Sequence, residues 1–294
     1  MVNNSMSDSD SDSGGGGIDN NLSAMIQQIR SMFTEEVKTN GHLYDQIDID
    51  RVISDDYTIE RYLKHQRDDI DKGFNMLVES MRWRHSFGVN QIQLTDFPKE
   101  YFETGEAHLY TEDQNGVSTV YVRVKLHKKI NELSLLSQKF LVYLFERCEI
   151  EGRKSGKGYG LIWDCYGGNL FNVDIELLQF LTGIWINYYP GGTKYILLHE
   201  LPWILRAIYR LARSWIPDNL REQICFASKN DIGSFIGTKQ LPDYLRGECK
   251  VNYKKAPQVC QPMKKFIENE IIESEGGKKF LDHYKSYLET PFKV

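Results

Sequence analysis

The sequence predicts an α/β protein in which an N-terminal helical module precedes a mixed, largely parallel five-stranded sheet flanked by helices. Three observations support this prediction. Residues 22–90 carry apolar side chains at helical spacing, and an Asn-Gly pair at 115–116 marks a β-hairpin. After the hairpin, short apolar strands alternate with helical segments, an order that produces parallel strands joined by crossover helices.

The helical module is expected over residues 21–90. The stretch "DDIDKGFNMLVESMRWRHSFGVN" places five apolar side chains on one helical face, namely Ile70, Phe74, Leu77, Val78 and Met81. Gly88 follows the last of them and marks the end of this helix. We interpret these apolar positions as the contacts of helices that pack on helices.

The sheet is predicted from residue 107 onward. "AHLYTEDQNGVSTVYVRVKLH" contains two extended runs, and the second alternates valines at 120, 122 and 124 with polar or aromatic side chains at 121, 123 and 125. A helix at about 133–150 follows, then the strand "GYGLIWDCYGG", the helix "VDIELLQFLTGIWINYYP", the strand "KYILLHEL", another helix, and the strand "EQICFAS". Residues 251–294 are polar, with one helix expected near 278–289.

The amino-acid composition indicates a globular protein and argues against some classes of function. The 294-residue chain is 41% hydrophobic and 26% charged, as in ordinary globular proteins. Residues 1–20 contain "SMSDSDSDSGGGG" and almost nothing apolar, so we expect an acidic, disordered tail there. Without the four aspartates of this tail, the formal net charge of −5 becomes −1. A nearly neutral remainder argues against a nucleic-acid-binding protein.

The cysteines and the apolar runs indicate a location. The five cysteines show no Cys-x-x-Cys spacing, which is typical of small core residues in a reducing compartment. The N-terminus carries no apolar run of the signal-peptide type, and no window of 18 residues is apolar and uncharged. We therefore expect a cytoplasmic protein that does not span a bilayer.

Motifs for catalysis are missing. "EGRKSGKGYG" fails as a phosphate loop, because Glu151 and Gly158 stand where a glycine and a hydroxyl residue belong, and because it precedes a strand. The seven histidines form no HExxH motif, and no G-x-S-x-G elbow is present. Asp164 ends a predicted strand, and we interpret it as a turn cap. We expect no catalytic residue, no metal and no cofactor.

The segment between Pro202 and Pro217 has a distinctive pattern. As a helix it is about 21 Å long, which is too short to cross a bilayer. One face carries a basic row, Arg206, Arg210 and Arg213, and the opposite face carries Ile204, Ile208, Leu211 and Trp215. Two interpretations stay open: a surface helix with solvated arginines that covers the sheet, or an interfacial helix that meets lipid headgroups. The neighbouring aromatic segments would suit a filled core or a cavity wall.

Several segments together resemble the CRAL-TRIO lipid-binding family, which includes phosphatidylinositol transfer proteins and tocopherol and retinaldehyde carriers. "ERYLKHQRDDIDKGFNMLVESMRWRHSFGV" resembles the helical module of that family, and "YYPGGTKYILLHELPWILRAIYRLARSWIPDNLREQICFAS" resembles its YPERLGKI…N.P..F…KPFLDP segment. "LPDYLRGE" resembles its closing LP..FGG. The run "PWILRAIY…SWIPDNL…FASKND" is most similar to the CRAL-TRIO part of motile sperm domain-containing proteins.

The resemblance implies a lipid-binding domain over residues 91–250, whose sheet is the floor of an apolar cavity, and a C-terminal helical extension over 251–294. It also implies that the helix at 203–216 is a movable gate. The expected lipid-binding residues are Tyr121, Arg123, Leu161, Trp163, Phe180, Ile184, Tyr188, Leu197, Ile204, Ile208, Leu211 and Phe226. The expected membrane contacts of the gate are Trp203, Arg206, Arg210, Arg213 and Trp215.

Three positions depart from the family pattern. Members that bind phosphatidylinositol have an acid and a lysine for the inositol headgroup where this chain has Gly191 and Gln223, which argues against that specificity. The closing Gly-Gly is Arg246-Gly247. Motile sperm domain-containing proteins continue into a second domain and a membrane anchor, so we expect this chain to be a different architecture or a fragment.

Two functions from different classes follow. The first is non-enzymatic binding of a hydrophobic lipid, and its transfer between membranes, by a protein that contacts membranes peripherally. The alternative is a CRAL-TRIO-type protein-interaction module at membranes with a filled cavity, which would bind a protein partner through its basic helix or its acidic tail. An enzyme that acts on lipids lacks a catalytic set in this sequence.

Overall fold

The computed structural model describes residues 15–290 and 292 of the chain. The chain divides into two compact units, Met1–His85 and Ser86–Val294, which are described separately. The first helix, α1, spans Gly15–Asn40 and so begins inside the segment that was expected to be disordered up to residue 20. Extending an existing helix by a turn costs far less than nucleating one, which allows α1 to continue into the glycines. The rest of the expected tail, residues 1–14, lies outside the described residues.

The N-terminal unit consists of helices that pack on helices, as predicted. After α1 come α2 (Gln46–Ser54), α3 (Asp56–His65) and α4 (Ile70–Phe87). Leu77, Val78 and Met81 are buried in their common core, while Ile70 and Phe74 pack against its edge. Helix α4 ends at a left-handed Gly88, whose φ of 76° suits a residue without a Cβ.

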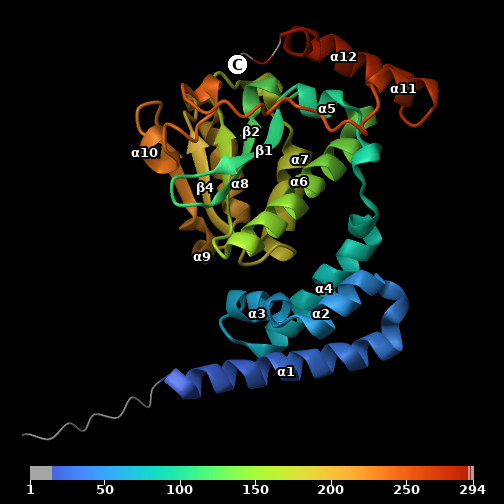
Figure 1. Cartoon of the computed structure of the whole chain (residues 1–294), viewed down its shortest axis with the longest axis vertical. Coiled ribbons are helices and arrows are strands. Elements are labelled where there is room, and N and C mark those ends of the chain that lie inside the picture. The colour runs from blue at the N-terminus through green and yellow to red at the C-terminus, as the bar shows by residue number, and fades with distance from the viewer. Residues whose placement is uncertain (1–14, 291, 293–294) are drawn as a thin grey trace, which may run out of the picture. The chain divides into compact units, whose positions relative to one another are not determined.

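The second unit is built on a five-stranded sheet in the order β1-β2-β3-β4-β5 (Figure 1). The strands are β1 (Ala107–Glu112), β2 (Ser118–Arg123), β3 (Tyr159–Asp164), β4 (Thr193–His199) and β5 (Ile224–Ala227). The hairpin pair β1–β2 is antiparallel, and the three following pairs are parallel. The predicted mixed, largely parallel sheet is therefore confirmed.

Each crossover in the sheet is made through a helical segment. The connections contain α6 (Ser134–Ser155), α7 (Ile175–Asn187) and, before β5, α8 (Arg206–Trp215) with the short α9 (Asp218–Arg221). A 3-10 turn, Trp203–Leu205, precedes α8, so the helix expected at 203–216 is present in two adjoining pieces.

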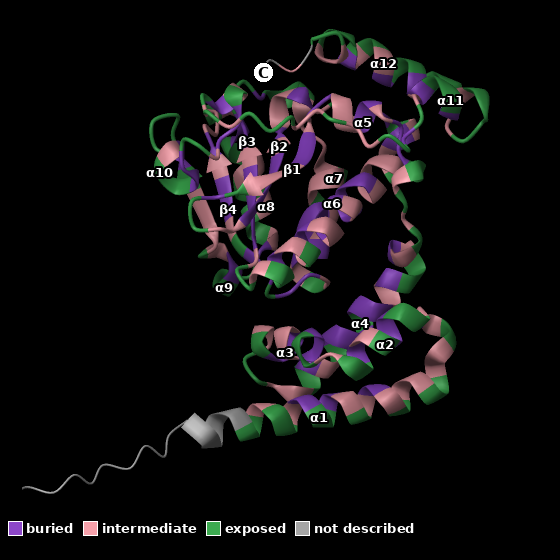
Figure 2. Cartoon of the chain, in the orientation of Figure 1, coloured by how far each residue is buried: buried purple, intermediate pink, exposed green. Residues whose placement is uncertain are grey.

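The sheet has two differently covered faces (Figure 2). Since side chains alternate along a strand, Tyr121, Ile162 and Leu197 share one face, and there they pack against Ile232 and Ile236 of α10 (Ile232–Ile236). Their neighbours in sequence, such as Val122 and Leu198, therefore point to the other face, which helices α6 to α8 cover. This second face carries the candidate site.

The C-terminal segment packs on the start of the second unit. It contains α11 (Met263–Glu268) and α12 (Ser274–Leu288), the latter confirming the helix expected near 278–289. Helix α12 contacts α5 (Glu100–Glu103), where Phe280 stacks on Tyr101 with ring centroids 5.0 Å apart. Residues far apart in sequence are thereby joined beside β1.

The packing of β3 on β4 yields a prediction about two glycines. A Cβ placed on Gly160 would lie 2.3 Å from Cζ of Tyr195, whose hydroxyl donates to Oδ2 of Asp113 at 2.8 Å. Gly160→Ala should lower the free energy of unfolding by about 1–3 kcal/mol through overpacking. Gly183→Ala, in α7 with no atom within 4 Å of the new Cβ, should raise it by about 1 kcal/mol. Urea denaturation of both variants tests this, and shifts of equal sign would contradict it.

Candidate functional site

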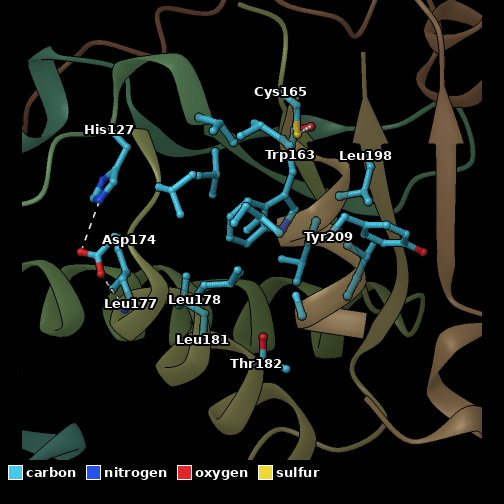
Figure 3. Close-up of a pocket in the computed structure, with 18 of the residues that line it drawn as sticks. His127, Trp163, Cys165, Asp174, Leu177, Leu178, Leu181, Thr182, Leu198 and Tyr209 are labelled. Carbon is cyan, nitrogen blue, oxygen red and sulfur yellow. Dashed lines mark hydrogen bonds and ion pairs between the residues drawn. The ribbon is translucent and has the colours of Figure 1, made fainter. Parts of the chain in front are cut away.

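An apolar pocket of about 210 Å³ lies between the sheet and the helices α7 and α8 (Figure 3). The strands contribute Val122, Leu161, Trp163, Ile196, Leu198 and Ile224. Helix α7 contributes Leu177, Leu178, Leu181, Thr182 and Trp185, and α8 with its flanks contributes Leu205, Ile208, Tyr209, Ala212, Arg213 and Ile216. For comparison, an apolar protein cavity of about 150 Å³ holds benzene. This pocket therefore has room for a larger apolar group.

The pocket is elongated along α7. Its lining runs from Leu177 to Trp185, which is about 12 Å at 1.5 Å per residue. The charged lining residues lie near the start of α7, where Glu106, His127 and Asp174 meet, and on α8, where Arg213 is; Thr182 adds one hydroxyl within the α7 wall. An unbranched apolar chain suits such a shape.

Strand alternation decides which predicted residues reach the pocket. Leu161 and Trp163 line it, as expected. Tyr121, Arg123 and Leu197 do not, because they lie on the opposite face of the sheet. The expectation for these three is corrected: Val122 and Leu198, which pair with Trp163 on either side, line the pocket in their place. Aligning the parallel strands on Trp163 would have identified this face.

The predicted row on α7 lies beside the lining row. At 100° per residue, Phe180 lies about 130° and Ile184 about 90° around the helix from the centre of the lining row. Tyr188 is the C-cap that follows α7 and does not line the pocket. Phe180 stacks on Phe87 with centroids 5.6 Å apart, and Ile184 is buried outside the pocket lining. The apolar surface of α7 is wider than one stripe, so periodicity alone did not indicate which part faces the pocket.

The helix at 203–216 presents a different face than expected. Ile208 lines the pocket, whereas Ile204 does not and Leu211 is 42% exposed. Phe226 is 52% exposed and meets Tyr209 edge to face, with ring centroids 5.3 Å apart. The expectations for Ile204 and Leu211 are corrected, because this helix turns Ile208, Tyr209 and Ala212 inward. Phe226 is corrected for another reason: it pairs with Leu198 on the edge strand β5 and borders the neighbouring surface hollow rather than the pocket.

The predicted membrane contacts lie largely on the surface. Trp203 is 78% exposed, and Arg206, Arg210 and Arg213 are all exposed. Trp215 is half-buried. Arg206 and Arg210 border a shallow surface hollow beside α8 that also includes the exposed Tyr166, while Arg213 reaches the border of the apolar pocket.

A polar cluster that the sequence analysis missed closes one end of the pocket. Nδ1 of His127 lies 2.8 Å from Oε1 of Glu106, and its Nε2 lies 3.6 Å from Oδ2 of Asp174. Tyr284 of α12 donates its hydroxyl to Oε2 of Glu106, and Asp174 caps α7 by accepting from the amide of Leu177 at 3.0 Å. Burial alone would lower the pKa of His127, but the hydrogen bond to Glu106 and the two carboxylate charges outweigh it and raise this pKa.

Polar groups also lie on the opposite face of the sheet. Asp164 accepts from the amide of Tyr166 at 3.2 Å, as expected for a turn cap, and its Oδ1 also lies 2.9 Å from Nδ1 of His199. The guanidinium of Arg123 lies over the ring of Tyr244, 3.9 Å from its centroid. Nearby, burial lowers the pKa of His108 to about 3, so this imidazole is neutral at physiological pH.

Within residues 15–290 and 292, no group of three or more His, Cys, Asp or Glu side chains is placed to hold a metal ion. The five cysteines are free, and burial raises the pKa of Cys165 to about 12, which makes this thiol unreactive. None of the helices in the described part of the chain is both long enough and apolar enough to cross a membrane.

Comparison with known families matches this arrangement to one domain type. Residues 102–247 match the model of the CRAL/TRIO domain. The chain belongs to the CRAL/TRIO family. The match begins just before β1 and ends after β5, so it contains the whole sheet and most of the pocket lining. Helix α12, which carries Tyr284, lies outside it.

Curated relatives agree with this assignment. The chain is 24% identical over 210 residues to a phosphatidylinositol transfer protein, CSR1, of Eremothecium gossypii, covering 67% of this chain and 48% of that protein. It is 20% identical over 206 residues to the human tyrosine-protein phosphatase non-receptor type 9, covering 68% of this chain and 35% of that protein. The chain thus spans about half or less of the length of these relatives. The finer similarity to motile sperm domain-containing proteins stays a prediction.

A solved structure supports the fold. The crystal structure of Sfh5 superposes with a TM-score of 0.62 at 14% identity, over 92% of this chain and 98% of that one. The helical module and the mixed sheet are thus a fold that this solved structure shares, as predicted.

The surroundings of His127 predict a measurable pH dependence. Because its folded-state pKa lies above the usual 6.5, the stability that it contributes is complete below pH 6.5 and is lost as the pH rises through the folded-state pKa. The deficit of His127→Asn in unfolding free energy should therefore be larger at about pH 6 than at about pH 8.5. Proton NMR of the imidazole rings checks the cause. The ring of His127 should titrate above 6.5, whereas that of His108 should not titrate over the same range.

Proposed function

We propose that this chain binds a hydrophobic lipid in the pocket between the sheet and α8, and transfers it between membranes without catalysing a reaction. The observation that carries the proposal is the elongated apolar pocket on one face of a CRAL/TRIO sheet. The name of the Eremothecium relative, a phosphatidylinositol transfer protein, supports the same class of activity.

The physical chemistry of the pocket supports this function. Each methylene that moves from water into such a site contributes about 0.8 kcal/mol, so a chain of about ten methylenes contributes about 8 kcal/mol. A ligand held in this way leaves slowly through water, and its release needs an apolar surface nearby. A membrane supplies that surface.

We propose that α8 is the gate through which the ligand passes. Every residue of α8 is described, and none of them is buried, so the helix is held by few core contacts. Pro202 precedes the helix and Pro217 follows it, and Glu200 adopts a left-handed φ of 50° just before the first proline. These features favour movement of α8 as a body around two short connections.

The outer side of α8 supports a peripheral contact with membranes from the cytoplasm. Arg206 and Arg210 are exposed along it, the exposed Trp203 lies in the 3-10 turn just before it, and Arg213 is exposed at the border of the pocket. These side-chain types favour the headgroup region. Near an anionic surface each arginine adds about 1 kcal/mol of attraction. Gate and membrane contact would thus be the same element.

The alternative, a protein-interaction module with a filled cavity, has less support. A pocket of about 210 Å³ beneath α8 favours a ligand-binding interior. A partner on the acidic tail would bind residues outside the described part of the chain. Gly191 and Gln223 argue against recognition of an inositol headgroup, so the proposal does not assign phosphatidylinositol as the ligand.

Filling the pocket should abolish lipid uptake. Ile208→Trp places a larger side chain in the pocket and should lower lipid uptake by about 10-fold or more. Leu211→Trp, three residues further along α8, is the matched control, since this position is 42% exposed and outside the pocket lining. Native mass spectrometry after incubation with lipid vesicles measures uptake. Equal uptake by both variants and the wild type would contradict the assignment of the pocket.

Neutralising the basic row should weaken membrane binding. Arg206→Ala with Arg210→Ala should lower the partition coefficient onto vesicles that contain phosphatidylserine by ~30-fold at low salt, from the loss of about 1 kcal/mol per charge. Lys278→Ala with Lys285→Ala removes two exposed charges from α12 and serves as the control. Vesicle co-sedimentation reports the partition. A loss of the same size in both double variants would mean that net charge, rather than α8, determines binding.

A further inference from the structure

The polar cluster at one end of the apolar pocket has an arrangement that the binding of an apolar chain leaves unexplained. Glu106 precedes β1, His127 follows the 3-10 turn Val124–Leu126, and Asp174 is the N-cap of α7. Three separate elements thus bring two carboxylates and one imidazole to the same border of the pocket, where all three are part of the lining. Figure 3 shows the His127 and Asp174 side chains directed toward one another.

Most polar atoms of this cluster are already engaged. Oε1 of Glu106 meets Nδ1 of His127 at 2.8 Å, and Oε2 accepts from Tyr284. Oδ1 of Asp174 accepts from the amide of Leu177. The remaining two atoms, Nε2 of His127 and Oδ2 of Asp174, form an ion pair with each other at 3.6 Å, which is longer than a hydrogen bond. Nε2 is buried and has no hydrogen-bond partner within the described residues.

A hydroxyl oxygen placed about 2 Å to one side of this pair would reach both atoms, and would replace the long ion pair with two hydrogen bonds of about 2.8 Å. It can donate to the carboxylate oxygen of Asp174 and at the same time accept from a protonated Nε2 of His127, because a hydroxyl is both donor and acceptor. A phosphate or carboxylate fits poorly, since it brings a negative charge close to two carboxylates that the imidazolium balances only in part. A further cation that interacts with Asp174, Lys129, is already paired with Glu176 at 2.8 Å. The net negative charge of the three side chains therefore favours a neutral polar group of the ligand over an anionic one.

We propose that Glu106, His127 and Asp174 form a subsite for the hydroxyl group of a neutral single-chain lipid, such as a long-chain alcohol. The inference rests on the proposed function, because it names the ligand class of the same pocket. His127 and Asp174 contact the hydroxyl. Glu106 and Tyr284 are positioning residues: they hold the imidazole, and Tyr284 does so from α12, outside residues 102–247 of the family match.

The experiment compares two ligands that share the alkyl chain and the oxygen, one of which carries a methyl group in place of the hydroxyl hydrogen. The affinities of the full chain for 1-hexadecanol and for its methyl ether are measured by competition against a fluorescent lipid. The wild type should bind the alcohol on the order of 10-fold more tightly, because the ether cannot donate to Asp174 and leaves that contact unmade. Palmitate, with the same chain and a carboxylate, should also bind more weakly than the alcohol.

Two variants separate the subsite from the fold. Asp174→Ser keeps a side-chain oxygen that caps α7 but removes Oδ2, and His127→Asn keeps a donor for Glu106 but removes Nε2. Each should reduce the preference for alcohol over ether toward unity, with cooperative unfolding retained. Leu178→Ala, in the apolar wall of α7, should weaken alcohol and ether by the same factor.

The outcomes are distinguishable. Equal affinity of the wild type for alcohol and ether would overturn the subsite while the pocket remains a lipid site. An alcohol preference that persists in both Asp174→Ser and His127→Asn would also overturn it. If neither ligand binds, and no phospholipid is taken up from vesicles, the proposed function itself fails.

Discussion

The alternation of side chains across β2, β3 and β4 is the constraint on which the rest of the second unit depends. The three strands are parallel and in register, with Trp163 between Val122 and Leu198 on one face. On the other face Ile162 lies between Tyr121 and Leu197 in a closed core. A shift of one residue in any strand would exchange these two sets. The same pairing that closes one face thus keeps the other free for a ligand.

The helices over the pocket differ in how firmly they are held. Helix α6 carries seven buried residues and packs on three strands, whereas α8 carries none. If α8 buried as many side chains as α6 does, it would stabilise the domain more, but moving it away to admit a ligand would cost more free energy. The pocket is therefore bounded by a rigid floor and one weakly held wall, which agrees with a function that requires the ligand to enter and leave.

Much of the fold could be predicted from the sequence, because local chemistry determines it. The Asn115-Gly116 turn, the alternation of strands with helices and the end of α4 at Gly88 were each visible in a short window. The pocket lining was predicted less well. Leu161, Trp163 and Ile208 were found, but the residues on β2 and β4 were chosen from the wrong face. A window of sequence shows that side chains alternate; which set faces the helices depends on pairing between distant strands.

The polar end of the pocket could not be predicted from the sequence for a related reason. Glu106, His127 and Asp174 are separated by 21 and 47 residues and belong to no spacing motif, and Tyr284 comes from a segment far beyond the sheet. Such a cluster exists only after the crossovers have been made. The rotation of α8, which turns Leu211 outward and Ile208 inward, likewise depends on which side chains of the sheet face that helix.

The hydrogen bond from Tyr284 to Glu106 connects the C-terminal helix α12 to the polar end of the pocket. Docking of α12 and binding of a ligand would both order the side chain of His127, through Glu106. When α12 has already ordered this side chain, the ligand loses less free energy on ordering it, so the two events are coupled. Linkage is reciprocal, so occupancy of the pocket would in turn hold α12 against α5. A segment outside residues 102–247 would in this way be coupled energetically to the pocket.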